Sequence, residues 1–251
     1  MNGGDFFQPR ENAENAKRAA RRNTAPVSQS SSLRSLRSFA AKNAVPLPAS
    51  FFAPPADVVA PKLLGHFLLR RAPDGAWAGG EIVETEAYLA NDPACHAFRG
   101  ETARNRSMFG PPGRAYVYFI YGNYFCCNTV CAAQGVGEAV LIRAIEPDFG
   151  VEWMQQNRPV PKPRELTSGP AKLCLALDIQ RPLDGANLCS LESDLIVAKN
   201  PDVKNFLREH GPVVTTTRIG LSVAAHLPLR FYLDGSEFVS RRRKQGTGVV
   251  V

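Results

Sequence analysis

The sequence lacks long apolar runs: no window approaches eighteen consecutive apolar residues, which excludes a membrane-spanning helix. It also lacks an internal repeat and a heptad pattern, so neither a solenoid nor a coiled coil is expected. The six cysteines, with Cys126 and Cys127 adjacent, follow no disulfide framework and no cleavable signal. We therefore expect reduced thiols and a cytosolic or nuclear compartment.

Histidine is scarce as well, with four in the chain, one of which is His96 in the stretch DPACHA. A metal centre would recruit Asp92, His96 and a cysteine from the group Cys126, Cys127 and Cys131. The paired C-x-x-C and H-E-x-x-H spacings typical of zinc sites are missing. We therefore expect no metal and no cofactor, and the cysteines are typical of small apolar core residues.

The net charge of +7 is concentrated at the two ends of the 251-residue chain. Residues 1–50 carry +5 and the run Arg241 to Lys244 carries +4, which leaves −2 for residues 51–240. A near-neutral body excludes a histone-like protein whose whole surface is cationic. It is compatible with a polyanionic partner that is held partly by the basic ends.

Composition divides the chain into three parts. Residues 1–50 are rich in Ala, Arg, Ser and Asn and predict a disordered basic tail, although an organelle transit peptide has a similar composition. Residues 51–240 have the apolar density of one mixed α+β domain, and residues 241–251 form a basic C-terminal tail.

Periodicity within the domain predicts strands at 66–71, 80–88, 139–144, 213–219 and 229–233, and helices at 57–64, 150–157 and 168–177. Residues 91–113 are rich in Gly and Pro and predict a long structured loop, which in a compact domain usually has a function. Two β-prone runs, AYVYFIY and YFCCNTV, flank Gly122-Asn123 and predict a hairpin.

The stretch ETEAY holds a candidate general base. Strand alternation places Glu86 and Tyr88 on one face, and a carboxylate beside an aromatic ring can activate a water molecule. Glu84 shares that face. The pattern alone therefore does not decide between the two carboxylates, or between a base and a solvated strand end.

Tyrosines gather in the predicted hairpin, where four of the six lie within nine positions: Tyr116, Tyr118, Tyr121 and Tyr124. A ring at a hairpin tip either packs against a neighbouring loop or projects as a wedge. A wedge beside a pocket that contains Tyr88, His96 and Tyr118 would suit a protein that extracts and holds a nucleobase.

The turn length decides the position of Asn128. A two-residue turn would pair Tyr118 with Cys127 and leave Asn128 on the opposite side of the ribbon. A three-residue turn at 122–124 would bring Asn128 directly opposite Tyr118. We predict the three-residue turn, because only this register places an amide beside the stacking ring.

Four further basic residues are candidates for function. Arg143 closes the apolar strand VLIRAIEP, where it either pairs with Glu146 or lies exposed. Arg104 and Arg106 in the long loop are candidates for contacts with phosphates. So is Lys172, which lies where a helix begins and free N–H groups suit an anion.

Taken together, these stretches resemble the alkyladenine or 3-methyladenine DNA glycosylase family. The matching stretches run in consistent order from about Leu63 to Ser240: GGEIVETEAY, DPACHAFRG, ARNRSMFGPPGRAYVYFIYGNYFCCN, GEAVLIRAIEP, SGPAKLCLAL, TTRIG and LRFYLDGS. The chain departs from the family at Pro61, which interrupts the usual first helix, and at Leu229, where the family commonly has Trp. The first 50 residues match nothing in the family.

The resemblance implies a curved, largely antiparallel sheet with a protruding β-hairpin that intercalates into DNA. It implies that Tyr88, His96 and Tyr118 enclose a flipped base, that Asn128 screens the edge of this base, and that Tyr121 fills the gap left in the duplex. It further implies that Glu86 activates the water and that Arg143 helps to set up the nucleophile.

The function that follows is a monomeric, metal-free DNA repair glycosylase acting on damaged purines in double-stranded DNA. Substrates would be 3-methyladenine and 7-methylguanine, and also hypoxanthine or ethenoadenine, which need protonation at a ring nitrogen. No lysine lies in the pocket cluster, so we expect no Schiff base and no lyase activity. No membrane is involved, and the location would be cytoplasm or nucleoid in a bacterium and nucleus in a eukaryote. The alternative is a non-catalytic nucleic-acid-binding or RNA-processing module.

Overall fold

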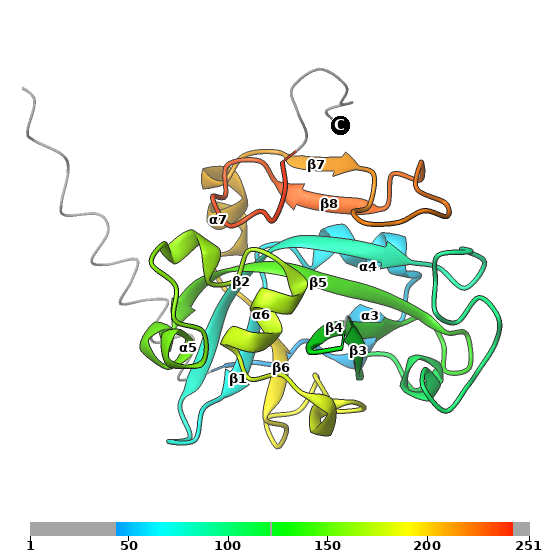
Figure 1. The fold of residues 1–251 in the computed structure, drawn as a ribbon, viewed down its shortest axis with the longest axis horizontal. Helices are drawn as coiled ribbons and strands as arrows, with labels where there is room; N and C mark the ends of the chain where they lie inside the picture. Colours follow the sequence, from blue (N-terminus) through cyan, green and yellow to red (C-terminus); the bar gives the residue numbers. More distant parts are fainter. Residues whose placement is uncertain (1–43, 121, 243–251) are drawn as a thin grey trace, which may run out of the picture. The chain divides into compact units, whose positions relative to one another are not determined.

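Eight strands form a curved antiparallel sheet in the computed structural model, which describes residues 44–120 and 122–242 (Figure 1). The strands are β1 (Phe67–Arg71), β2 (Trp77–Tyr88), β3 (Ala115–Ile120), β4 (Tyr124–Cys131), β5 (Glu138–Phe149), β6 (Leu195–Ala198), β7 (Val213–Thr216) and β8 (Arg230–Leu233). Six of them follow the order β3-β4-β5-β2-β1-β6, while β8 pairs with both β2 and β7. The expected single α+β domain is thereby confirmed.

Short helices cover this sheet. They are the α-helices α3 (Ala49–Phe52), α4 (Ala56–Lys62), α5 (Val151–Asn157), α6 (Pro170–Ala176) and α7 (Val203–Glu209), and the 3₁₀ turns η1 (Arg106–Phe109), η2 (Pro163–Glu165) and η3 (Arg181–Leu183). Helix α4 continues through Pro61, so this departure from the family does not remove the helix. None of the helices in the described part of the chain has the length and apolarity needed to cross a bilayer.

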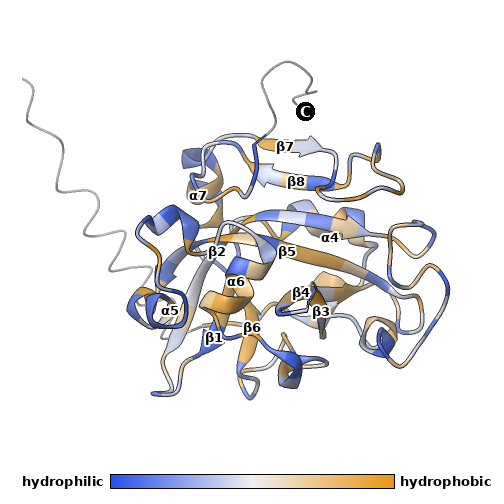
Figure 2. Ribbon diagram, in the orientation of Figure 1, coloured by the Kyte–Doolittle hydropathy of each residue, from blue (hydrophilic) through white to orange (hydrophobic). Residues whose placement is uncertain are grey.

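The main hydrophobic core lies between the sheet and the helices α4 and α6. Its members include Phe52, Leu64, Ile142 and Leu173, all of which are buried. Figure 2 shows the apolar residues that continue along β5. A smaller cluster, with Cys95, Met108, Tyr116, Val130 and Ala139, fastens the long loop after β2 onto β3, β4 and β5. This cluster holds one wall of the candidate site.

Strands β2 and β5 form the centre of the fold. Each has twelve residues, and one edge of β2 is shared by β1 at its first half and β8 at its second half. The β2–β5 ladder steps from Ile82–Ile145 to Glu84–Ala144 and then to Thr85–Ile142, so Val83 and Arg143 fall outside it. Such irregularities redirect side chains, and here one of them sets the direction of Arg143.

The hairpin register differs from the prediction. Tyr118 pairs with Cys126, Tyr116 pairs with Asn128, and Ile120 pairs with Tyr124. The turn therefore lies between Ile120 and Tyr124, and the predicted turn at 122–124 is wrong by two positions in register. Because the strand period is two residues, this shift keeps Asn128 on the same face as Tyr118, diagonally across from it. Tyr121 itself lies outside the described residues.

The beginning of the domain also differs from the composition boundary. Leu47 and Ala44 are buried, the Leu47 N–H donates to the Val197 carbonyl at 2.8 Å, and Pro46 bridges to Ala198. Residues 44–47, assigned to the tail from their composition, therefore pack on β6, and Ala49 and Ser50 belong to α3. The predicted tails at 1–43 and 243–251 lie outside the described residues.

A methyl group at Gly80 should destabilise this centre, because an added Cβ would lie 1.8 Å from the Glu146 carbonyl oxygen. We expect Gly80→Ala to lower the free energy of unfolding by about 1–3 kcal/mol, the usual cost of overpacking. Urea unfolding followed by circular dichroism measures it. The matched control is Gly110→Ala, whose Cβ would lie 3.2 Å from the nearest atom. Equal losses in both variants would contradict this account.

Candidate active site

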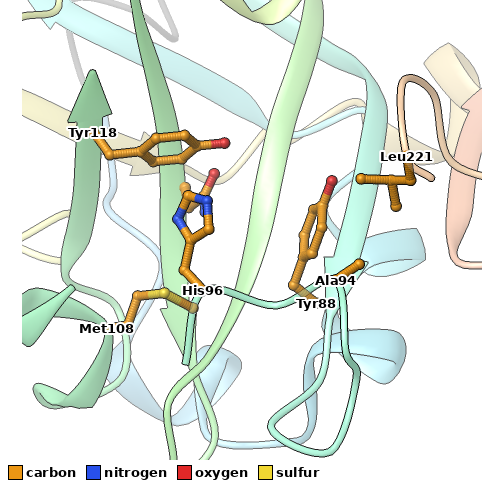
Figure 3. Close-up of a pocket in the computed structure, with 7 residues that line it drawn as sticks. Tyr88, Ala94, His96, Met108, Tyr118 and Leu221 are labelled. Carbon is orange, nitrogen blue, oxygen red and sulfur yellow. The ribbon is translucent and has the colours of Figure 1, made fainter. Parts of the chain in front are cut away.

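A cavity of about 100 Å³ lies between the end of β2, the loop after it, and the hairpin strands β3 and β4. Its lining consists of Tyr88, Ala94, His96, Met108, Tyr118, Asn128 and Leu221. The four residues that the sequence analysis assigned to a base pocket, Tyr88, His96, Tyr118 and Asn128, thus meet in one cavity. Figure 3 shows His96 and Tyr118 on one side and Tyr88 across from them.

One wall of the cavity is a stack of aromatic rings. The rings of Tyr116 and Tyr118 stack with centroids 5.1 Å apart, and the His96 imidazole meets Tyr118 edge-on at 4.6 Å. His96 Nδ1 lies 2.9 Å from the Tyr116 hydroxyl. These contacts hold the imidazole of a loop residue against the hairpin, although the loop itself has no regular structure at that point.

The protonation states of His96 and Tyr116 in this wall follow from their burial. Burial, together with the nearby Arg104 guanidinium, lowers the pKa of His96, so the imidazole is neutral at physiological pH. Burial raises the pKa of Tyr116 to about 12, so its hydroxyl keeps its proton. When Tyr116 donates to Nδ1, the imidazole proton resides on Nε2 and is available to a bound molecule.

Glu86 is fully buried and accepts three hydrogen bonds or ion-pair contacts. The Tyr88 hydroxyl donates to Oε2 at 2.8 Å, the Ile219 N–H donates to Oε1 at 2.8 Å, and Arg143 Nη1 lies 3.1 Å from Oε1. The common face expected for Glu86 and Tyr88 is therefore present. Because Tyr88 lines the cavity, its hydroxyl connects this carboxylate to the cavity wall.

Glu84 has a different environment, although it is equally buried. Its carboxylate accepts from Arg143 Nε at 2.9 Å, from Arg230 Nε at 2.7 Å, and from both the N–H and the hydroxyl of Ser240 at 2.7 and 2.9 Å. Burial alone would raise the pKa of Glu84, but the two guanidinium groups and Ser240 bring it below its usual value. Glu84 is therefore a fixed anion with no part in the cavity lining.

Arg143 lies between the two carboxylates. The sequence left open a pair with Glu146 or an exposed position; instead Arg143 is buried and contacts Glu84 and Glu86. Glu146 contacts His210 and Ser236. Burial would lower the pKa of Arg143, but the charges of Glu86 and Glu84 raise it, so the guanidinium stays charged.

Asn128 brings an amide to the cavity wall. Its side chain is buried, and its Oδ1 has no hydrogen-bond partner among the described residues. A buried carbonyl oxygen without a donor costs about 1–3 kcal/mol. A bound molecule that offers a donor at this position would remove that cost, whereas one that offers an acceptor would not.

The ion pair of Arg218 and Asp92 holds the side of the cavity formed by Tyr88 and Ala94. Arg218 was not among the candidate residues of the sequence analysis. The Arg218 guanidinium lies 4.6 Å from the Tyr88 ring centroid, donates to the Ala87 carbonyl at 3.0 Å, and pairs with Asp92. Asp92 in turn accepts from the Ala94 N–H at 3.0 Å. The pair therefore joins the segment after β7 to the loop that carries Ala94 and His96.

The three candidate phosphate contacts do not line the cavity. Arg104 is exposed and donates to the Phe119 carbonyl at 3.3 Å, and Arg106 is exposed and pairs with Glu101 at 3.3 Å. Lys172 lies half-buried in the first turn of α6. Their expected contacts with phosphates stay predictions.

The alternative metal set is not assembled, because Asp92 pairs with Arg218 and His96 with Tyr116. Within 44–120 and 122–242, no three His, Cys, Asp or Glu side chains gather as ligands. Arg218, Arg230 and Ser240 were missed by sequence reasoning. Arg218 and Arg230 could have been found by the pattern that indicated Arg143, which is a single charged residue within or beside an apolar strand.

The chain is similar to known proteins over most of its length. A family model described as methylpurine-DNA glycosylase matches residues 50–237. A protein of Methanoculleus marisnigri is 48% identical over 196 residues, which covers 78% of this chain and 99% of that protein. Proteins of Francisella tularensis (47%, covering 73% and 92%) and Carboxydothermus hydrogenoformans (46%, covering 78% and 99%) are similar. All three are provisionally named 3-methyladenine DNA glycosylases.

The titration of His96 tests the electrostatics of the wall. Arg104→Gln removes one of the two causes that lower the pKa of His96, and burial remains. We expect the titration midpoint to rise in this variant while staying below that of an exposed histidine. Imidazole NMR shifts followed against pH measure it. Arg106→Gln, a neighbouring exposed arginine, should leave the midpoint unchanged, and an unmoved midpoint in Arg104→Gln would contradict the assignment.

Proposed function

Because the chain belongs to the methylpurine-DNA glycosylase family, we propose that it excises alkylated purines from duplex DNA by hydrolysing the N-glycosidic bond. The observation that carries the proposal is the buried Glu86 carboxylate, joined by the Tyr88 hydroxyl to the wall of an aromatic cavity. A general base and an aromatic pocket that holds the flipped base are the two parts that this reaction needs.

In the proposed reaction, Glu86 orients a water molecule toward C1′ of the flipped nucleotide. The water oxygen forms a bond to C1′ as the bond from C1′ to the purine nitrogen breaks, and Glu86 takes the proton of the water. The electron pair of the broken bond leaves with the purine. An alkylated purine such as 3-methyladenine or 7-methylguanine is cationic, so this electron pair neutralises it and no proton donor is required.

Arg143 and Tyr88 would set the direction of Glu86 in this step. Arg143 Nη1 and the Ile219 N–H contact Oε1, which leaves the Tyr88 hydroxyl on Oε2. Burial and the charge of Glu86 raise the pKa of Tyr88, so its hydroxyl stays a donor. A carboxylate held by three donors cannot rotate freely, and such positioning contributes strongly to hydrolysis.

The cavity would recognise the base through stacking and two polar groups. Tyr88 and Tyr118 offer ring faces, which attract a cationic purine more than a neutral one. The neutral His96 offers a donor, and the unpartnered Oδ1 of Asn128 favours a base edge that carries a donor. Hypoxanthine and ethenoadenine are neutral lesions, and we propose that they leave after protonation at a ring nitrogen.

The enzyme would release the free base without cutting the strand. Among the described residues that line the cavity there is no lysine, so no amine is available there for a Schiff base with C1′. The exposed rings of Phe119 and Tyr124 beside the hairpin turn support a role of this tip as a wedge. In this proposal, Tyr121 enters the vacated stack and the protein acts as a monomer. The basic ends of the chain would add contacts with phosphates that do not depend on sequence.

One assay separates this function from a non-catalytic nucleic-acid-binding or RNA-processing module. Duplexes that carry 3-methyladenine, 7-methylguanine, hypoxanthine or ethenoadenine are incubated with the protein and a chelator, and the free base is measured by chromatography. Release of alkylated purines with the strand left intact supports the proposal. Tight binding without release of any base would favour the module.

Glu86→Gln should abolish hydrolysis and retain recognition. The amide keeps the shape of the side chain but cannot accept the proton of the water, so single-turnover excision should fall about 10²-fold or more. Binding of lesion DNA, measured by fluorescence anisotropy, should stay near that of the unaltered protein. Glu237→Gln, an exposed carboxylate in the C-terminal part, is the control. Normal excision by Glu86→Gln would overturn the assignment.

Tyr121→Ala should weaken capture of the flipped base, because the stack closes again when no ring fills it. We expect a loss of about 1–3 kcal/mol in binding to lesion duplex. The loss should be smaller for a lesion in single-stranded DNA, where less unstacking is needed. Binding to both substrates by anisotropy gives the comparison, and equal losses would indicate that the ring serves the fold.

A further inference from the structure

Arg143 uses all three of its guanidinium nitrogens for contacts inside the protein. Nε donates to Glu84 at 2.9 Å, Nη2 donates to the Ser240 hydroxyl at 3.3 Å, and Nη1 lies 3.1 Å from Glu86. A guanidinium is planar and rigid, so two fixed nitrogens determine the place of the third. The position of Nη1 beside Glu86 therefore depends on Glu84 and Ser240.

Ser240 is central to this arrangement. Its hydroxyl donates to Glu84 Oε1 and accepts from Arg143, and its N–H donates to Glu84 Oε2. Ser240 thus contacts both the Glu84 carboxylate and the Arg143 guanidinium, and Arg143 in turn contacts Glu86. It lies 156 positions from Glu84 in the sequence, so only the folded chain brings them together.

The segment around Ser240 is held on both sides. Arg230 pairs with Glu84 and also donates to the Arg241 carbonyl, directly after Ser240. Arg242 reaches back and donates to the Ser236 carbonyl at 2.8 Å. We name residues 236–242 the C-terminal strap. These contacts fix the strap backbone, so the Ser240 N–H and hydroxyl are presented to Glu84 in a defined direction.

The charges in this cluster balance, since two carboxylates face two guanidinium groups, all of them buried. A buried ion pair often adds little to stability compared with apolar residues of similar size. Its geometry, by contrast, holds a functional group within a fraction of an ångström, which is what a reaction requires. The cluster is therefore better suited to orienting Arg143 than to stabilising the fold.

We propose that Ser240 and Glu84 are positioning residues for hydrolysis, which hold Arg143 so that its Nη1 meets Glu86. This inference rests on the proposed function, in which Glu86 activates the water. It extends the active site to one residue of the C-terminal strap, Ser240, and to Glu84, although neither residue lines the cavity. It also gives the second buried carboxylate of β2 a role other than that of a base.

The test compares two serines of the strap. Ser240→Ala removes the hydroxyl that contacts Arg143 and Glu84, whereas Ser236→Ala removes a hydroxyl that donates to Glu146 at 2.9 Å. Single-turnover excision of an alkylated duplex should fall about tenfold in Ser240→Ala while binding of lesion DNA changes less than about twofold. Ser240→Thr, which keeps the hydroxyl, should restore most of the rate, and Ser236→Ala should excise normally.

Several outcomes would overturn the inference. A normal rate in Ser240→Ala, an equal loss in Ser236→Ala, or a loss that follows the thermal stability of the variants would each show a role confined to the fold. Glu84→Gln is a second test: single-turnover excision should fall more than in Ser240→Ala, while binding of lesion DNA is retained. If the unaltered protein released no alkylated base, the proposed function would fail. If it did, and the Ser240 and Glu84 variants excised normally, this inference alone would fail.

Discussion

The contact of one guanidinium group with two buried carboxylates is the constraint on which the rest of this structure depends. Arg143 lies between Glu84 and Glu86 in the centre of the sheet, where an unpaired charge would cost several kcal/mol. The three groups can be buried only together, and Arg230 completes the balance of charge. The irregular β2–β5 ladder serves this requirement, because it turns Arg143 toward β2.

The cavity is built outward from that buried cluster. Tyr88 connects the buried cluster to the cavity, because its hydroxyl donates to Glu86 and its ring lines the cavity. The Arg218 guanidinium lies over the same ring. Arg218 and Asp92 hold the long loop in place, and that loop carries His96 to the hairpin. A loop without regular structure thereby acquires a defined geometry, because its polar groups are paired with rigid strands.

Much of the fold could be predicted from periodicity, since the long strands β2 and β5 and the hairpin strands show strong apolar patterns. Short elements carry weak patterns: α3, β6 and α7 were not predicted, whereas β7 and β8, which are equally short, were. The predicted hairpin register was wrong by two positions, because the last pair of the hairpin is Ile120 with Tyr124. Residues 44–50 have the composition of a tail, yet Leu47 is buried against β6.

The sequence by itself determined the candidate chemistry: a carboxylate beside an aromatic on β2, a cluster of tyrosines at a hairpin, and an isolated arginine in an apolar strand. The residue pattern by itself left Glu84 and Glu86 equal. The tertiary structure gives them different environments, since Glu84 is enclosed by four donors and Glu86 contacts the cavity wall through Tyr88. Only the tertiary structure gave Arg143 its partners and brought Ser240 to them. Alternation assigns a face to each residue, but the environment of a buried charge depends on groups up to 156 positions away, and these meet only in the folded chain.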